Sequence, residues 1–314
     1  MELVKEQSQQ EIINKINELR KKKNAIILAH YYQRGEIQDI ADYIGDSLEL
    51  ARKAQDTDAD IIVFAGVKFM AETAKILNPD KKVLHPNPES GCPMADMATL
   101  EGVKKLKEEH PDAVVVSYIN TNADVKTVSD IIVTSRNAVK VIKSLDAKKI
   151  IFVPDQFLGG FVAKQVPEKE FILWKGFCPP HFNLSPEQLL PLKEKYPDAK
   201  IAVHPECHTD TAKIADFVGS TTQIIEYATT CDSDTVIIGT EVGIEHALKK
   251  ANPNKNYVFP QSADYCGTVH CCDMKKNTLD KILEVLEEET NEIILPEDVI
   301  EKARIPLEKM VSIV

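Results

Sequence analysis

The sequence predicts an α/β protein of three pseudo-equivalent βαβ-type domains, each with a small parallel sheet, around a central active site. Two observations predict this class. Short apolar runs rich in β-branched residues alternate with helix-length segments, which is the pattern of parallel βαβ units. The pattern also occurs three times along the 314 residues, and internal repetition of this kind indicates related structural units.

Nine apolar runs are expected to form the strands. Several are apolar without interruption, as expected for parallel strands covered on both faces. The nine expected strands are residues 25–29, 60–66, 82–85, 113–119, 149–154, 170–174, 200–204, 234–239 and 256–259. Helix-length segments separate them, for example residues 36–55 and 130–145. The nine strands form three groups of three.

The three groups superimpose when Ala25, Ala113 and Ala199 are aligned. The first strand of each group then ends in an equivalent residue, which is His30, Tyr118 or His204. A serine follows sixteen or seventeen residues later, at Ser47, Ser135 and Ser220. In the first two groups a cysteine follows sixty to sixty-two residues after the strand end, at Cys92 and Cys178. In the third group, Cys266 lies sixty-two residues after His204 and Cys271 lies sixty-seven residues after it. Repeat spacing alone favours Cys266.

The repeat divides the chain into a helix and three domains. We expect an N-terminal helix over residues 1–23 and α/β domains over residues 24–112, 113–198 and 199–314, the last with C-terminal helices. Apolar residues at helical spacing predict an amphipathic helix near each end. These residues are Ile12, Ile13, Ile16 and Leu19 near the N-terminus, and Leu279, Ile282, Leu283 and Leu286 near the C-terminus.

Composition excludes several classes of function. The net charge of −11 disfavours nucleic acid or an anionic membrane as a partner. The sequence has no run of eighteen apolar residues and no secretory signal, so a cytoplasmic location is expected. Seven cysteines, an odd number in a reducing compartment, do not predict a disulfide framework.

Polar residues gather where the expected strands end. In parallel sheets, ligands bind beyond the carboxyl ends of the strands. Residues 30–32, 117–120 and 204–208 follow the first strand of the three groups, and residues 86–94, 175–181 and 262–274 follow the last. Each of the latter loops carries a cysteine beside proline or glycine. If the three domains face a common axis, their cysteines converge.

The cysteine spacing is unlike that of common metal sites. One cysteine in about ninety residues fits neither a zinc finger, which needs close pairs, nor the ferredoxin run. Three thiolates around an iron–sulfur cluster would leave one iron with an open position, and that iron can act as a Lewis acid. Spacing alone leaves two readings open, a convergent metal or cluster site and scattered core thiols.

The motifs resemble those of the quinolinate synthase family, in order and over nearly the whole chain. They are HYYQ (30–33), DSLELA (46–51), FMAETAKIL (69–77), PESGCPMAD (88–96), SYINTNADVK (117–126), TSRNA (134–138), WKGFCPPH (174–181), HPEC (204–207), GST (219–221), GTEVGIEHAL (239–248) and CCDMKKNTL (271–279). The resemblance implies three α/β domains around one oxygen-sensitive [4Fe–4S] cluster. It also implies condensation of iminoaspartate with dihydroxyacetone phosphate to give quinolinate, phosphate and water, in NAD synthesis.

The resemblance implies three cluster ligands. Cys92 and Cys178 match the first two directly. The family pattern of Cys-x-x-Met-Lys followed by Thr-Leu places the third at Cys271, against the repeat spacing that favours Cys266. The adjacent Cys272 is a second alternative.

The resemblance also implies roles for polar residues. Tyr32, Glu206 and His204 are expected to be catalytic, with Glu206 as general base because tautomerisation and dehydration need a carboxylate near an acidic C–H. The expected substrate-binding residues are His30, Ser47, Tyr118, Asn120, Ser135, His181, Ser220 and Thr221. The serines are alternatively simple helix N-caps.

Three other functions compete. A cluster-dependent hydro-lyase would share the open iron, and a redox sensor would use the cluster as a signal. A zinc hydrolase would use His204, Glu206 and His208, although these lie beside a strand end and not in the helical His-Glu-x-x-His arrangement. Small-molecule substrates are the expected partners, with possible transient contact with the enzyme that makes iminoaspartate.

Overall fold

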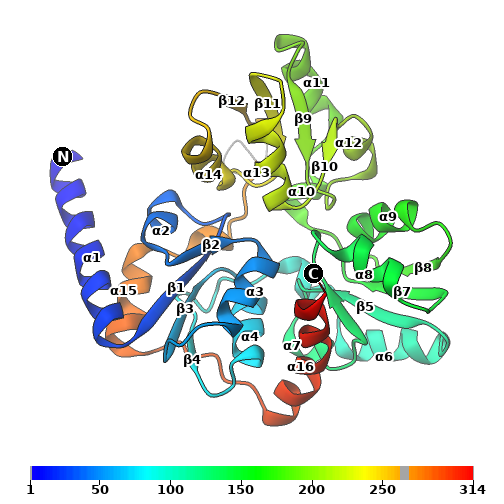
Figure 1. Ribbon diagram of the computed structural model, residues 1–314, viewed down its shortest axis with the longest axis horizontal. Helices are drawn as coiled ribbons and strands as arrows, with labels where there is room; N and C mark the ends of the chain where they lie inside the picture. Colours follow the sequence, from blue (N-terminus) through cyan, green and yellow to red (C-terminus); the bar gives the residue numbers. More distant parts are fainter. Residues whose placement is uncertain (1, 262–268, 314) are drawn as a thin grey trace.

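The structure consists of three separate parallel sheets with helices around them (Figure 1). It is a computed structural model that describes residues 2–261 and 269–313. The first sheet has the order β2 (Tyr43–Gly45), β1 (Ala25–His30), β3 (Ile61–Ala65) and β4 (Lys82–Leu84). The second has β6 (Ile131–Val133), β5 (Val114–Tyr118), β7 (Lys149–Val153) and β8 (Glu170–Leu173). The third has β10 (Phe217–Val218), β9 (Lys200–Val203), β11 (Thr235–Gly239) and β12 (Asn256–Val258).

All three sheets have the same strand order, which confirms the predicted fold class. In each, the first strand in sequence lies between the second and the third, and every pairing is parallel. The central strands are almost fully buried and β-branched, as in β3, where all five residues are buried. The exact domain boundaries at residues 112 and 198 stay a prediction.

The nine predicted strands are confirmed, but each sheet has a fourth strand that the sequence interpretation missed. Residues 36–55 form not one helix but α2 (Gly35–Ile40), β2 and α3 (Ser47–Gln55). Residues 130–145 likewise contain β6 before α8 (Ala138–Ser144). These edge strands have only two or three residues and lie a few residues before a helix, so they were included in the helix-length segments.

Helices cover the sheets and lead into the central site. Those that follow the first sheet's strands are α4 (Lys68–Leu77), α5 (Pro93–Asp96) and α6 (Leu100–Glu109). The next are α7 (Ala123–Lys126), α9 (Gln156–Gln165), α10 (Pro179–Phe182) and α11 (Pro186–Lys195). The third sheet carries α12 (Thr209–Lys213), α13 (Thr221–Thr230), α14 (Ile244–Ala251) and the 3₁₀ helix η1 (Met274–Lys276).

The terminal helices tie the ends of the chain to the first two sheets. Helix α1 (Glu2–Lys22) packs against α15 (Leu279–Glu288), and Ile16 and Ile282 are buried in one cluster with Ile27 of β1. Helix α16 (Glu297–Ser312) packs against β6, α4 and α7. Both amphipathic predictions are confirmed. Although α15 and α16 follow the third sheet in sequence, they pack on the first and second sheets (Figure 1). Among the described residues, no helix combines the length and apolarity that crossing a membrane requires.

Candidate active site

A cavity of about 450 Å³ is lined by loops from all three sheets. The predicted site residues that line it are His30, Tyr32, Ser47, Cys92, Tyr118, Asn120, Ser135, Cys178, His181, His204, Glu206, Thr221 and Cys271. Ser220 is not among the lining residues. It is the N-cap of α13, and its hydroxyl accepts from the backbone N–H of Gln223 at 3.4 Å. The structure thus gathers almost all of the predicted residues, while their individual roles stay predictions.

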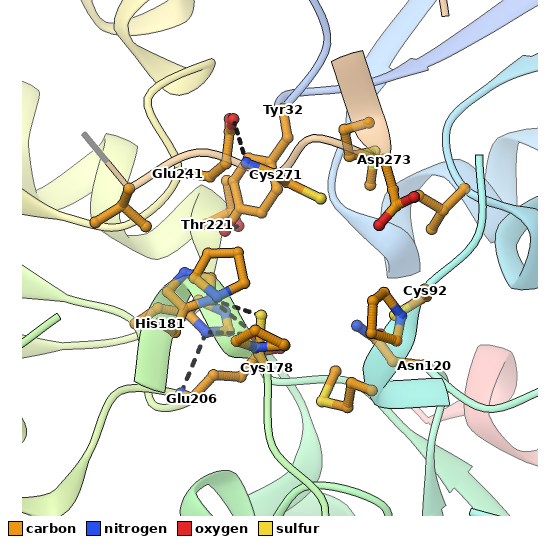
Figure 2. Close-up of a pocket in the computed structure, with 18 of the residues that line it drawn as sticks. Tyr32, Cys92, Asn120, Cys178, His181, Glu206, Thr221, Glu241, Cys271 and Asp273 are labelled. Atoms are coloured by element: carbon orange, nitrogen blue, oxygen red, sulfur yellow. Dashed lines mark hydrogen bonds and ion pairs between the residues drawn. The ribbon is translucent and has the colours of Figure 1, made fainter. Parts of the chain in front are cut away.

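Two of the three cysteines share the same local structure. Cys92 is the N-cap of α5 and Cys178 the N-cap of α10, and each is followed by a proline at the first helical position. Proline at this position has the φ that a helix start requires, so it fixes the turn that presents the thiol. Cys271 lies just before η1, and its backbone N–H donates to Glu241 Oε1 at 3.2 Å. Figure 2 shows the three side chains around the same cavity.

The three thiols lie in surroundings that disfavour a free thiolate. Burial raises the pKa of all three, that of Cys271 to about 12. For Cys178, the neighbouring Glu206, Cys92 and Cys271 raise the pKa further, because several negative charges would share one cavity. A bound metal would reverse this balance, since its positive charge stabilises thiolate ligands.

Cys272 and Cys266 are the two alternatives for the third ligand. Cys272 also lines the cavity, but it is exposed, whereas Cys271 is half-buried. Cys266 lies outside the described residues. The choice of Cys271 therefore stays a prediction.

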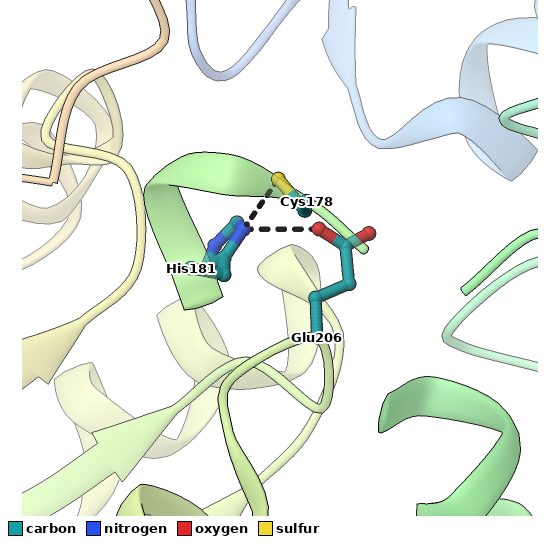
Figure 3. Close-up of side chains that lie close together, drawn as sticks. All are labelled: Cys178, His181 and Glu206. Atoms are coloured by element: carbon teal, nitrogen blue, oxygen red, sulfur yellow. Dashed lines mark hydrogen bonds and ion pairs between the residues drawn. The ribbon is translucent and has the colours of Figure 1, made fainter. Parts of the chain in front are cut away.

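Cys178, His181 and Glu206 form a group that could hold a metal ion (Figure 3). Their ligand atoms lie within 4.8 Å of one another. His181 Nδ1 is 3.1 Å from Cys178 Sγ and 2.9 Å from Glu206 Oε2. These are hydrogen-bond distances, so the imidazole Nδ1 lies between the thiol and the carboxylate.

Glu206 is buried yet surrounded by groups that favour its ionised form. The Tyr118 hydroxyl donates to Oε1 at 2.7 Å, and His204 Nδ1 lies 3.8 Å from Oε2. Burial opposes ionisation, but the hydrogen bonds from His181 and Tyr118 hold the pKa of Glu206 below its usual range. An ionised carboxylate can accept a proton, which is what a general base does.

His30 and His204 are equivalent in the repeat and are held in the same way. The Nδ1 of His30 accepts from the backbone N–H of Tyr32 at 3.1 Å, and the Nδ1 of His204 accepts from that of Glu206 at 3.3 Å. Burial lowers the pKa of His30 to about 3 and that of His204 to about 4. Both rings are therefore neutral at pH 7 and carry their proton on Nε2, which in His204 lies 3.3 Å from Ser135 Oγ.

The helix starts beside the cavity are partly used by the protein itself. Ser47 is the first residue of α3, but Asp46 caps this helix and accepts from the backbone N–H groups of Leu48 and Glu49, each at 3.0 Å. Fewer helix N–H groups are thus free for a substrate anion than the sequence suggested. The Ser47 and Thr221 side chains line the cavity.

Sequence reasoning assigned no role in the site to three buried residues around it. Thr240, which directly follows β11, lies 2.8 Å from both the Tyr32 hydroxyl and His181 Nε2. Glu241 holds the Cys271 backbone and pairs with Lys275 at 3.1 Å. Lys126 is fully buried and donates to the carbonyl of Ile119 at 2.9 Å. The sequence signal was available for the first two, because the carboxyl end of the third strand faces the site like that of the first.

The structure disfavours the zinc hydrolase alternative, because His208, one of its three expected ligands, lies away from the other two. His208 is the N-cap of α12, accepts from the backbone N–H of Asp210 and packs against the ring of Phe157. It does not line the cavity that contains His204 and Glu206.

Comparisons with known proteins agree with this site. A family model described as Quinolinate synthetase A protein matches residues 14–312. The chain is 86% identical over 303 residues to the quinolinate synthase of Sulfurihydrogenibium sp. (strain YO3AOP1), covering 96% of this chain and 98% of that protein. It is 64% identical over 312 residues to the quinolinate synthase of Aquifex aeolicus (strain VF5), covering 99% and 97%. It is 50% identical over 302 residues to that of Alkaliphilus metalliredigens (strain QYMF), covering 96% and 98%. The chain belongs to the quinolinate synthase family.

Proposed function

We propose that this chain condenses iminoaspartate with dihydroxyacetone phosphate to form quinolinate, with release of phosphate and water. The observation that carries the proposal is the meeting of Cys92, Cys178 and Cys271, one from each sheet region, in a cavity that also contains Glu206. Membership of the quinolinate synthase family supports it.

The donor set fits a [4Fe–4S] cluster held by Cys92, Cys178 and Cys271. Three half-buried thiols with raised pKa values, facing one cavity, need a strongly positive partner to become thiolates. When bound, a cluster with three cysteine ligands supplies one iron that can act as a Lewis acid on a substrate oxygen.

The chain's own residues supply binding and proton transfer. Glu206 is the proposed general base, oriented by the Tyr118 and His181 hydrogen bonds. His204 is neutral, and its Nε2–H is a donor suited to a carboxylate or carbonyl oxygen. Burial raises the pKa of Tyr32 well above its usual value, so Tyr32 enters the reaction as a protonated hydroxyl.

The remaining cavity residues suit substrates that bring two carboxylates and a phosphate. The proposed binding groups are His30, Ser47, Tyr118, Asn120, Ser135, His181, Ser220 and Thr221. Asn120 Oδ1 is buried and has no hydrogen-bond partner within the described structure, so a ligand N–H or O–H would satisfy it. Ser220 would act through the start of α13, which it caps.

Anaerobic purification and assay test this function. We expect about four iron and four sulfide per chain, and quinolinate and phosphate formed from iminoaspartate and dihydroxyacetone phosphate. Cys92→Ser, Cys178→Ser and Cys271→Ser are expected to abolish cluster assembly, whereas Cys272→Ser and Cys266→Ser retain it. A full cluster in Cys271→Ser would reject the third ligand, and a loaded wild-type protein without quinolinate formation would reject the reaction.

We also propose a transient contact with the enzyme that makes iminoaspartate, because imines hydrolyse in water. Quinolinate yields should be higher when the two enzymes are mixed than when a dialysis membrane separates them. Equal yields would contradict the contact.

A further inference from the structure

A buried lysine in the second repeat holds the backbone on both sides of Asn120. The Nζ of Lys126 donates to the carbonyl of Ile119 at 2.9 Å and also to the carbonyl of Thr121. These two carbonyls flank Asn120, which lines the cavity and whose Oδ1 has no hydrogen-bond partner within the described structure. Lys126 itself is fully buried and does not line the cavity, so it acts through this loop.

The ammonium of Lys126 is bound by uncharged oxygens. Its third acceptor, at 3.4 Å, is the hydroxyl oxygen of Thr121. Burial of an ammonium costs free energy unless it is hydrogen-bonded, and here the loop supplies those bonds. Glu72, of opposite charge, is also buried and accepts from the backbone N–H of Ala123 at 3.0 Å. The loop that carries Asn120 is therefore held through both its carbonyl and its N–H groups.

A glutamine makes the same pair of contacts in the first repeat. The Nε2 of Gln38 donates to the carbonyls of Tyr31 and Gln33, each at 3.0 Å. These carbonyls flank Tyr32, which faces the same cavity as Asn120 (Figure 2). Gln38 is buried as well, and its Nε2 also donates to the carbonyl of Gly243 at 2.9 Å.

The contacts coincide with the sequence repeat. Gln38 and Lys126 each lie eight positions after the end of the first strand of their sheet, in the short helix α2 or α7. The flanked residues Tyr32 and Asn120 each lie two positions after the same strand end. An amide and an ammonium thus make equivalent bonds at equivalent positions, and what they share is the pair of carbonyls, not the charge.

The third repeat holds its cavity residue in another way. The position of Gln38 and Lys126 is taken by Ala212, whose side chain has no donor. The flanked position is Glu206, and the hydroxyl of Tyr118 donates directly to its carboxylate. The Oδ1 of Asn120 has no such partner, so the place of its amide depends on the backbone of the loop.

We propose that Lys126 is a positioning residue that fixes residues 119–121 and so presents the Asn120 amide to a carboxylate of the substrate, and that Gln38 holds Tyr32 in the same way. The effect on binding rests on the proposed function, because the anionic substrate belongs to that reaction. The effect on the loop does not rest on it.

Three substitutions in the cluster-containing protein test the proposal. Lys126→Met removes the donors and the charge but keeps a long unbranched side chain. Lys126→Gln places the amide of the first repeat at the equivalent position. Lys169→Met is the matched control, because Lys169 also donates to two carbonyls two residues apart, those of Leu145 and Ala147, and does not line the cavity.

Amide hydrogen exchange measures the loop independently of activity. We expect residues 119–123 to exchange roughly tenfold faster in Lys126→Met, because the loop loses its hydrogen bonds to the side chain. Lys126→Gln should keep the exchange near that of the wild type, since an amide holds the same turn in the first repeat. Lys169→Met should leave this segment unchanged.

Steady-state kinetics measure the consequence for binding. Lys126→Met should raise KM by roughly tenfold and change kcat by less than about threefold, because a displaced binding group is lost from the substrate complex and the transition state alike. In an Asn120→Ala background the same substitution should change KM little, since Lys126 acts through Asn120. Iron content should equal that of the wild type throughout, and Lys169→Met should keep the wild-type KM.

The outcomes separate this inference from the proposed function. Wild-type exchange over residues 119–123 in Lys126→Met overturns the inference, as does an equal rise in KM with and without Asn120→Ala. If Lys126→Met does not fold, Lys126→Gln decides, and fast exchange of the loop in that variant overturns the inference. If the loaded wild type forms no quinolinate, the proposed function fails, and hydrogen exchange still decides whether Lys126 holds the loop.

Discussion

Glu206 is the residue at which the polar contacts of the cavity meet. It accepts from Tyr118 and His181, and its own backbone N–H donates to His204. These contacts fix the position of the carboxylate, because rotation of any one neighbour would break a hydrogen bond to Glu206. This arrangement fits a base that must reach a C–H in one geometry.

Glu206→Gln tests the base directly. The amide has nearly the same shape but cannot take up a proton, so we expect kcat to fall by roughly 10²–10⁴-fold. Cluster content should be unchanged, because the substitution leaves all three proposed cysteine ligands in place. The measurement is steady-state quinolinate formation with iron analysis of the same sample. A loss below tenfold would contradict the assignment.

The buried histidines predict how stability depends on pH. Burial lowers the pKa of His204 to about 4 and that of His30 to about 3, whereas both titrate near 6.5 in an unfolded chain. Between these values the unfolded chain binds more protons than the folded one. The stability that these two neutral histidines contribute is therefore fully present above about pH 6.5 and is lost as the pH falls toward 4.

Melting temperatures measured between pH 7.5 and pH 5 check this dependence. A shift from 6.5 to about 4 at His204 corresponds to roughly 3 kcal/mol in full, and part of this is lost by pH 5, so the melting temperature should fall steadily on acidification. His204→Gln should reduce the slope, and His110→Gln, at the end of α6, should leave it unchanged. The same slope in the His204 variant and the wild type would contradict the account.

At the scale of single elements, an aspartate at an equivalent position in each repeat connects the edge strand to the first strand of its sheet. Asp42, Asp130 and Asp216 lie just before β2, β6 and β10. Each accepts from a backbone N–H of the first strand of its sheet, at 2.8 to 2.9 Å. Their own N–H groups donate to the same strand at 2.9 Å. Their spacings of 88 and 86 residues equal those of the repeat.

This repeated contact is expected to stabilise each edge strand. Asp130→Ala should destabilise the protein by about 0.5–1.5 kcal/mol, because the N–H of Val115 loses its partner. Asp130→Asn keeps an acceptor oxygen and should lose less. Hydrogen exchange at Val115, together with the melting temperature, measures the effect. An alanine variant with unchanged protection would rule out the role.

The fold was predictable where hydrophobicity was periodic or continuous, and less so elsewhere. The nine predicted strands and the two terminal amphipathic helices could be recognised because burial selects their apolar residues. The edge strands could not, since Phe217 and Val218 alone make up β10. The equal spacing of Asp42, Asp130 and Asp216 could have indicated these edge strands, which the hydrophobic pattern does not show.

The site was predictable only where residue type and repeat position coincided. His30, Tyr118 and His204 stood out because they end equivalent strands. Thr240 did not stand out, because its two contacts, with the Tyr32 hydroxyl and the His181 imidazole, join residues that are distant in sequence. Asp46 likewise takes the cap position that the sequence interpretation gave to serine.

At the scale of the whole molecule, one arginine joins all three sheet regions beside the cavity. Arg136, between β6 and α8, lies 2.6 Å from Glu49 Oε1 and 3.8 Å from Asp46 Oδ2 of the first region. It also lies 3.9 Å from Glu226 Oε1 of the third region. The Thr222 hydroxyl, from α13, donates to Asp46 Oδ2 at 2.9 Å. Asp46 lines the cavity, so this network connects a residue of the cavity wall with all three sheet regions.

Loss of this network should change substrate binding more than chemistry. Arg136 is about one third exposed, so each of its ion pairs contributes at most about 1 kcal/mol. Arg136→Ala should therefore raise KM by roughly fivefold, since 1.4 kcal/mol corresponds to a factor of ten, while kcat and iron content change little. Arg136→Lys should restore this only in part, because a single ammonium cannot reach carboxylates on two sides as a guanidinium does. Lys140→Ala, an exposed residue in α8, is the control and should match the wild type. High salt should raise the KM of the wild type toward that of Arg136→Ala, because salt screens the same ion pairs. An Arg136→Ala variant with the wild-type KM at low salt would show that the network has no part in forming the cavity.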